Sequence, residues 1–133
     1  MARYVIDAQV ALRLAADPAA LHPAHQLVAP NSLRSEAMAI LFREMRAGIR
    51  TRGDAMDLLD PLTALKVRLL GDRVSRGTAW RIAEENYWDD LGEAEYLAVT
   101  RLQADAFVTL DPERARRAEG IVPLAPFEAL GRE

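Results

Sequence analysis

Short apolar runs that alternate with longer amphipathic segments are the feature that most limits the folds open to this chain. Five runs have the length and apolar character of buried strands, and they cover residues 4–6, 27–29, 66–70, 107–110 and 121–124. Strands separated by helices pair in parallel, in a sheet that helices cover on both faces. The sequence therefore predicts a single α/β domain over residues 1–133, with a three-layer α/β/α fold and a mostly parallel, five-stranded sheet.

Helical segments are predicted between these runs. Apolar residues recur at helical spacing near residues 10–16, 32–48, 54–62, 72–88 and 91–102, and a short helix is expected from Pro112. Asn31 or Ser32 is the expected N-cap of the second of these helices. In the fourth, Val74, Ala79 and Ile82 are expected to face inward.

Charge and composition exclude several functional classes. The formal net charge is −3, so the chain lacks the basic excess of a protein that coats nucleic acid passively. The absence of cysteine excludes disulfides, thiolate zinc sites and cysteine nucleophiles. No apolar run approaches the roughly 20 residues that cross a bilayer, and no secretory signal is recognised. We therefore expect a cytoplasmic protein without membrane association.

Four carboxylates lie close to predicted strand ends. Asp7 directly follows the first strand, and Asp111 follows the run at residues 107–110. Glu36 and Glu93 lie in the first turns of two predicted helices. In open α/β sheets the ligand site lies beyond the carboxyl ends of the strands, so we expect the four acids to converge there. Converging carboxylates repel one another unless a cation is bound, and Mg²⁺ prefers carboxylate oxygens.

Each of these acids also has a structural explanation. Asp111 precedes a proline, as an N-cap does before a proline at the first helical position. Glu36 and Glu93 interact favourably with a helix dipole, and Asp90 has capping-box spacing to Glu93. Asp7 is the hardest to explain structurally, because a carboxylate after a buried strand is costly without a partner.

Four motifs surround these acids in order along the chain: residues 5–12 (VIDAQVAL), 29–37 (APNSLRSEA), 93–100 (EAEYLAVT) and 106–111 (AFVTLD). They resemble the motifs of PIN-domain proteins of the VapC toxin kind. Together they span almost the whole chain, in the order and spacing of that family.

The resemblance implies both a fold and an activity. The sheet would have the strand order 3-2-1-4-5, with the acids at its carboxyl edge. Asp7, Glu36, Glu93 and Asp111 would bind Mg²⁺ or Mn²⁺, directly or through water, for metal-dependent hydrolysis of RNA by a ribonuclease. A VapB-like antitoxin and a second copy of the chain in a homodimer are the implied partners.

The third acid departs from the family pattern, which has aspartate where this chain has Glu93. Asp90, and after it Asp89, are alternative metal ligands. One rival interpretation is a catalytically weakened PIN-fold binding module that acts through antitoxin or RNA contact. Another is a different metal-dependent nuclease or phosphatase on a doubly wound sheet.

Two further residues are predicted to contact substrate. Thr109 lies two residues before Asp111, where it can orient a ligand carboxylate, contact a phosphate or simply serve as a β-branched strand residue. Arg114 belongs to an arginine cluster, with Arg116 and Arg117, that adjoins the proposed site and can hold RNA phosphates.

Overall fold

Four parallel strands form the sheet in the computed structural model, which describes residues 1–133. They are β1 (Arg3–Ile6), β2 (Gln26–Pro30), β3 (Val67–Leu70) and β4 (Ala106–Val108), in the order β3-β2-β1-β4. All three pairings are parallel, and β1 pairs with both β2 and β4. The predicted α/β class and parallel sheet are confirmed, and all strands end at one edge of the sheet.

The prediction of a fifth strand at residues 121–124 is wrong. Only Leu124 reaches the sheet, through a single parallel bridge to Phe107 of β4. The N–H groups of Ile121 and Val122 donate to the carbonyl of Ala118, so these residues continue the turn that follows the helix ending there. The next N–H on that side belongs to Phe127, which begins a 3₁₀ helix and does not continue the ladder. The sheet therefore ends at β4 with one residue pairing beyond it.

The fourth strand is shorter than predicted, because β4 ends at Val108 and not at Leu110. The hydroxyl of Thr109 accepts a hydrogen bond from the backbone N–H of Asp111, at 3.2 Å. Such local side-chain bonds offer the backbone an alternative to the strand ladder. The chain therefore turns after Val108 and brings Asp111 back towards the end of β1.

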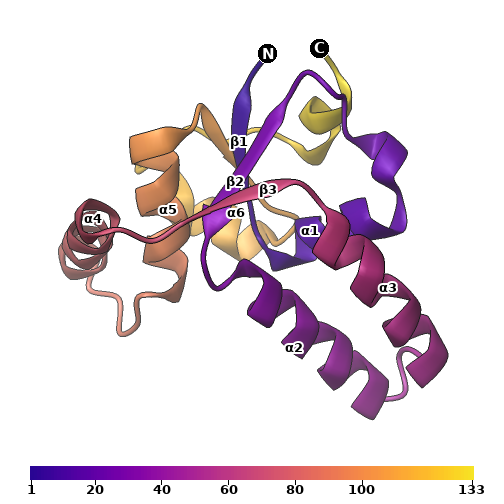
Figure 1. Ribbon diagram of the computed structural model, residues 1–133. Helices are drawn as coiled ribbons and strands as arrows, with labels where there is room; N and C mark the ends of the chain where they lie inside the picture. Colours follow the sequence, from indigo (N-terminus) through magenta and orange to yellow (C-terminus); the bar gives the residue numbers. More distant parts are fainter.

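Six α-helices lie on both sides of the sheet. They are α1 (Ala8–Ala16), α2 (Leu33–Arg46), α3 (Arg52–Ala64), α4 (Arg73–Glu85), α5 (Gly92–Gln103) and α6 (Pro112–Ala118), with short 3₁₀ helices at Pro18–Ala20 and Phe127–Gly131. Figure 1 shows α4 and α5 on one side of the sheet and α1, α2 and α3 on the other. The α2–α3 hairpin projects away from the sheet. None of the helices is both long and apolar enough to span a membrane.

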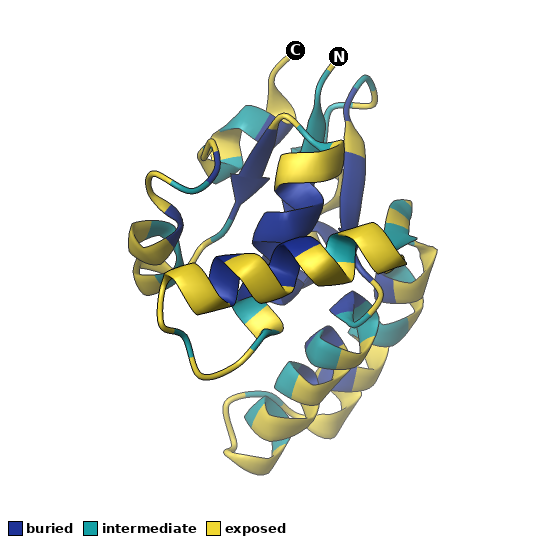
Figure 2. Cartoon of the chain, turned by 90° about the vertical axis from the view of Figure 1, so that its left-hand side faces the viewer, coloured by how far each residue is buried: buried dark blue, intermediate teal, exposed yellow.

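The core lies around the central strand β1, where Val5 and Ile6 are completely buried. Figure 2 shows α4 at the front with an exposed outer face and buried residues on its inner side, towards α5. Ala79 and Ile82 face inward as predicted, but Val74 is 63% exposed. At 3.6 residues per turn, Val74 lies about 140° around the helix from Ala79, so the two cannot share one buried face.

Candidate functional site

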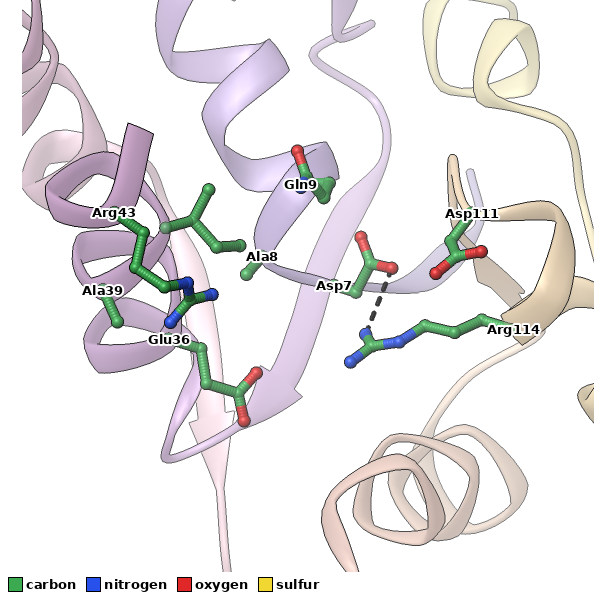
Figure 3. A pocket seen from close by; sticks show the side chains of 9 residues that line it. Asp7, Ala8, Gln9, Glu36, Ala39, Arg43, Asp111 and Arg114 are labelled. Carbon is green, nitrogen blue, oxygen red and sulfur yellow. Dashed lines mark hydrogen bonds and ion pairs between the residues drawn. The ribbon is translucent and has the colours of Figure 1, made fainter. Parts of the chain in front are cut away.

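A cavity of about 280 Å³ opens where β1, β2 and β4 end. Three carboxylates line it, those of Asp7, Glu36 and Asp111, together with the guanidinium groups of Arg43 and Arg114. We call it the acidic cavity. Figure 3 shows Arg114 pointing into the space among the three carboxylates, and Arg43 at the α2 side of the cavity, near Glu36. The structure thus brings together three of the four predicted acids, from segments that follow three different strands.

Asp7 is the most buried of these acids, with 1% of its surface exposed. One carboxylate oxygen accepts the backbone N–H of Val10 at 3.1 Å, so Asp7 is the N-cap of α1. The other accepts the hydroxyl of Thr109 at 2.5 Å and forms an ion pair with Arg114 at 3.3 Å. A buried charge is tolerated only with such partners. The sequence indicated that Asp7 needs partners but did not identify Arg114 as one or predict the cap.

Two hydroxyl groups hold the carboxylate of Glu36. Ser32 donates to one oxygen at 3.0 Å, and Tyr96 donates to the other at 2.5 Å. Ser32 occupies the N-cap position of α2, but its side chain makes no cap bond, because its hydroxyl is directed to Glu36. The predicted N-cap is confirmed at Ser32, although its side chain does not make the capping bond. Both donors orient Glu36 towards the acidic cavity.

Tyr96 lies within the third motif but was not predicted as a site residue. It is 1% exposed on the inner face of α5. Burial, and then the hydrogen bond to Glu36, raise the pKa of its hydroxyl far above the ordinary value. The hydroxyl consequently stays protonated at physiological pH and remains a donor to Glu36.

Replacing Tyr96 with phenylalanine should lower the free energy of unfolding by about 2 kcal/mol, because a bond to a charged acceptor is lost while the ring stays packed. Chemical denaturation measures this change. Tyr87→Phe is the matched control, since Tyr87 is 92% exposed. Equal stability of the Tyr96→Phe variant and the wild type would contradict a structural bond to Glu36.

Asp111 has the cap role that its sequence context predicted. Its carboxylate accepts the backbone N–H of Glu113 at 2.9 Å, and Pro112 is the first residue of α6. The same side chain lines the acidic cavity. Capping and a place in the cavity are therefore compatible, and Asp111 is the exposed member of the three acids.

Glu93 and Asp90 do not line the acidic cavity. Glu93 forms ion pairs with Arg114, at 3.6 Å, and with Arg117. Asp90 accepts the backbone N–H of Gly92 at 3.1 Å in a tight turn. The predicted capping box between Asp90 and Glu93 is wrong, because that turn uses the Asp90 carboxylate and the arginines bind Glu93. Asp89, the third candidate, is also exposed and outside the cavity.

Arg114 connects the two groups of acids. Its guanidinium pairs with Asp7 on one side and Glu93 on the other, and it lies 5.7 Å from the centroid of the Tyr96 ring. It supplies a positive charge where the sequence analysis expected a bound cation. Thr109 and Arg114, predicted as substrate contacts, are thus both bonded to Asp7 in this structure.

The oxygen-only donor set of Asp7, Glu36 and Asp111 suits a hard divalent cation. However, no three acidic or histidine side chains are gathered closely enough to hold a metal ion in this arrangement. The ion pair between Arg114 and Asp7 accounts for part of the difference, since the guanidinium occupies a position beside the most buried acid. The residues fit Mg²⁺ by their chemistry, and in this structure Arg114 pairs with the Asp7 carboxylate.

Comparison with known proteins shows the fold alone. No protein-family model matches the chain, and no curated protein matches its sequence. Among solved structures, the crystal structure of PAE2754 from Pyrobaculum aerophilum superposes with a TM-score of 0.71 at 24% sequence identity. The match covers 97% of this chain and 93% of that chain.

Proposed function

We propose that the acidic cavity binds Mg²⁺ or Mn²⁺ and hydrolyses phosphodiester bonds of RNA, as a ribonuclease of the VapC-like PIN kind. The supporting observation is the convergence of Asp7, Glu36 and Asp111 on one cavity at the carboxyl edge of a parallel sheet. A VapB-like antitoxin, homodimer formation and a cytoplasmic location belong to the same proposal.

The side chains have distinct roles in this proposal. Asp7 and Glu36 hold the cation, and Thr109 and Tyr96 fix the orientation of their carboxylates through hydroxyl donors. Asp111 completes the set at the exposed side of the cavity. Bound there, the cation would supply activation of a water molecule and compensation of the phosphate's negative charge. Arg43 lines the same cavity without a carboxylate partner and binds a phosphate oxygen of the substrate.

Arg114 changes partners in this proposal. When Asp7 binds the cation, the guanidinium of Arg114 keeps its other ion pair, with Glu93. Glu93 is then a positioning residue that holds Arg114 at the edge of the cavity, ready for the phosphate. Glu93 has a longer side chain than the aspartate that PIN-domain proteins have at this position. It reaches two arginines of α6.

Purified protein should cleave RNA in Mg²⁺ or Mn²⁺ and not in EDTA, and Asp111→Asn should slow cleavage by roughly 100-fold. Asparagine is as good an N-cap as aspartate, so α6 should stay folded and the loss should reflect the missing charge. Gel analysis of a labelled RNA measures the rate. Cleavage that continues in EDTA would disprove the proposed reaction.

A binding module without catalysis is the second candidate, and the position of Glu93 favours it. With this acid outside the cavity, only three carboxylates remain there. This candidate predicts that the wild type binds RNA, or a partner protein, but shows no cleavage with either metal in the assay above.

A further inference from the structure

A second cavity adjoins the acidic cavity beside α1. Its volume is about 460 Å³, and Gln9 and Asp111 line both cavities, so the two are contiguous. Arg13 of α1 and Arg50, which lies just before α3, also line it. We call this second cavity the arginine groove; its lining includes Gln9, Leu12, Arg13, Arg50, Leu110 and Asp111.

The charges in the arginine groove favour an anion. Two guanidinium groups face a single carboxylate, that of Asp111. Arg13 has no carboxylate partner, and its guanidinium lies 5.2 Å from the centroid of the Phe127 ring. Arg50 is held by Glu44 at 2.9 Å. Both arginines are thus restrained beside the groove; Glu44 balances the charge of Arg50, and the charge of Arg13 has no carboxylate partner.

Apolar side chains accompany these charges. Leu110 lines the groove and is 37% exposed, whereas Leu12, which also lines it, is 4% exposed. A free phosphate needs no apolar surface, whereas a nucleotide has a charged phosphate and a base with an apolar face. Bases offer such faces only when they are unpaired and unstacked, as in single strands. The groove therefore matches one unit of a single-stranded polynucleotide.

We propose that the arginine groove binds the nucleotide that adjoins the phosphodiester held in the acidic cavity. Arg13 and Arg50 contact its phosphate, and Leu110 contacts its base or sugar. Single-stranded RNA and DNA share this chemistry. The assignment of the neighbouring cavity as the place of cleavage rests on the proposed function, but binding in the groove requires neither the cation nor cleavage.

The test measures binding of a short, labelled single-stranded RNA by fluorescence anisotropy, in EDTA and over a series of salt concentrations. Each phosphate contact on a single strand contributes about 0.7 to the slope of log K against log salt. Arg13→Gln and Arg50→Gln should each reduce the slope by about 0.7, and the double variant by about 1.4. Arg68→Gln is the matched control, because Arg68 is an exposed arginine of β3 without an ion pair.

Further measurements separate binding in the groove from loss of fold and from effects on the acidic cavity. Arg13→Lys should restore the slope that Arg13→Gln loses, because a lysine keeps the phosphate contact. The double variant should keep the wild-type Kd for Mn²⁺, since it leaves Asp7 and Glu36 intact. A single-stranded DNA of the same sequence identifies the source of the nucleotide: equal affinity shows that the shared phosphate and base are read, and tighter binding of RNA adds a contact to the 2′-hydroxyl.

The outcomes distinguish this proposal from the proposed function. Three results would each contradict nucleotide binding in the arginine groove. They are an unchanged salt slope in the double variant, tighter binding of duplex than of single strands, and no RNA binding at low salt. Cleavage by a protein whose double variant binds RNA normally would leave the nuclease proposal standing alone. A different outcome is that the wild type never cleaves RNA while the double variant has a salt slope smaller by about 1.4. That result would support nucleotide binding in the groove and refute the nuclease proposal.

Discussion

Replacing Asp7 with asparagine should weaken Mn²⁺ binding about 100-fold and abolish metal-dependent cleavage of RNA. Asp7 is the most buried acid of the cavity, at 1% exposure, so the loss of its charge cannot be compensated by solvent. Removing one partner of a buried charge pair costs about 3 kcal/mol, which corresponds to about 100-fold in Kd. Isothermal titration calorimetry with Mn²⁺ measures the affinity directly, without any need for turnover.

The Asp7→Asn variant should remain folded, because asparagine can accept the same backbone N–H at the start of α1. Asp105→Asn is the matched control. Asp105 accepts the backbone N–H of Arg3 at 2.8 Å and immediately precedes β4, at the opposite end of that strand from the cavity. The control should bind Mn²⁺ as the wild type does. An equal Kd for the Asp7→Asn variant would place the cation elsewhere.

Replacing Arg114 with glutamine should have two opposite effects. The metal-free protein should lose about 2 kcal/mol of unfolding free energy, because buried Asp7 loses its ion pair. This value is at the low end for buried pairs, since Arg114 is 29% exposed. Mn²⁺ should bind about 30-fold more tightly, because the cation no longer has to displace the guanidinium from Asp7. Calorimetry and denaturation measure the two effects independently.

Thermodynamic linkage connects these two effects. If Arg114 and the cation compete for Asp7, the stability lost without metal should equal the affinity gained, and both proteins should be about equally stable in saturating Mn²⁺. Arg116→Gln is the matched control on α6, since Arg116 pairs only with the exposed Glu113. Weaker Mn²⁺ binding by the Arg114→Gln variant would mean that Arg114 supports the cation site and does not compete with it.

The sequence by itself determined the class of the fold and the places of three acids. Short apolar runs between helical segments predicted a parallel sheet, because strand and helix periodicity are properties of neighbouring residues. Parallel strands all end at one edge, so Asp7 and Asp111 were correctly expected to lie together. The cap at Asp111 was also predictable, since the signal is the adjacent proline.

The strand count, the partner of the Ser32 hydroxyl and the role of Asp90 were not predictable from local patterns. Residues 121–124 have strand character, but the backbone bonds to Ala118 leave only Leu124 on the sheet. Ser32 has the residue type of an N-cap, but a glutamate one turn later takes its hydroxyl. In each case two bonding partners compete, and packing decides which of them is within reach.

Only the tertiary structure decided how the acids are charge-balanced and oriented. Thr109 and Arg114 reach Asp7 across 102 and 107 residues of sequence, and Tyr96 reaches Glu36 across 60. The same packing turns Glu93 towards Arg117 and joins the arginine groove to the acidic cavity. These relations depend on side-chain direction and on distances between elements, which local periodicity does not encode. The sequence thus determined which residues come to the carboxyl edge of the sheet, and the packing determined which of them bind one another there.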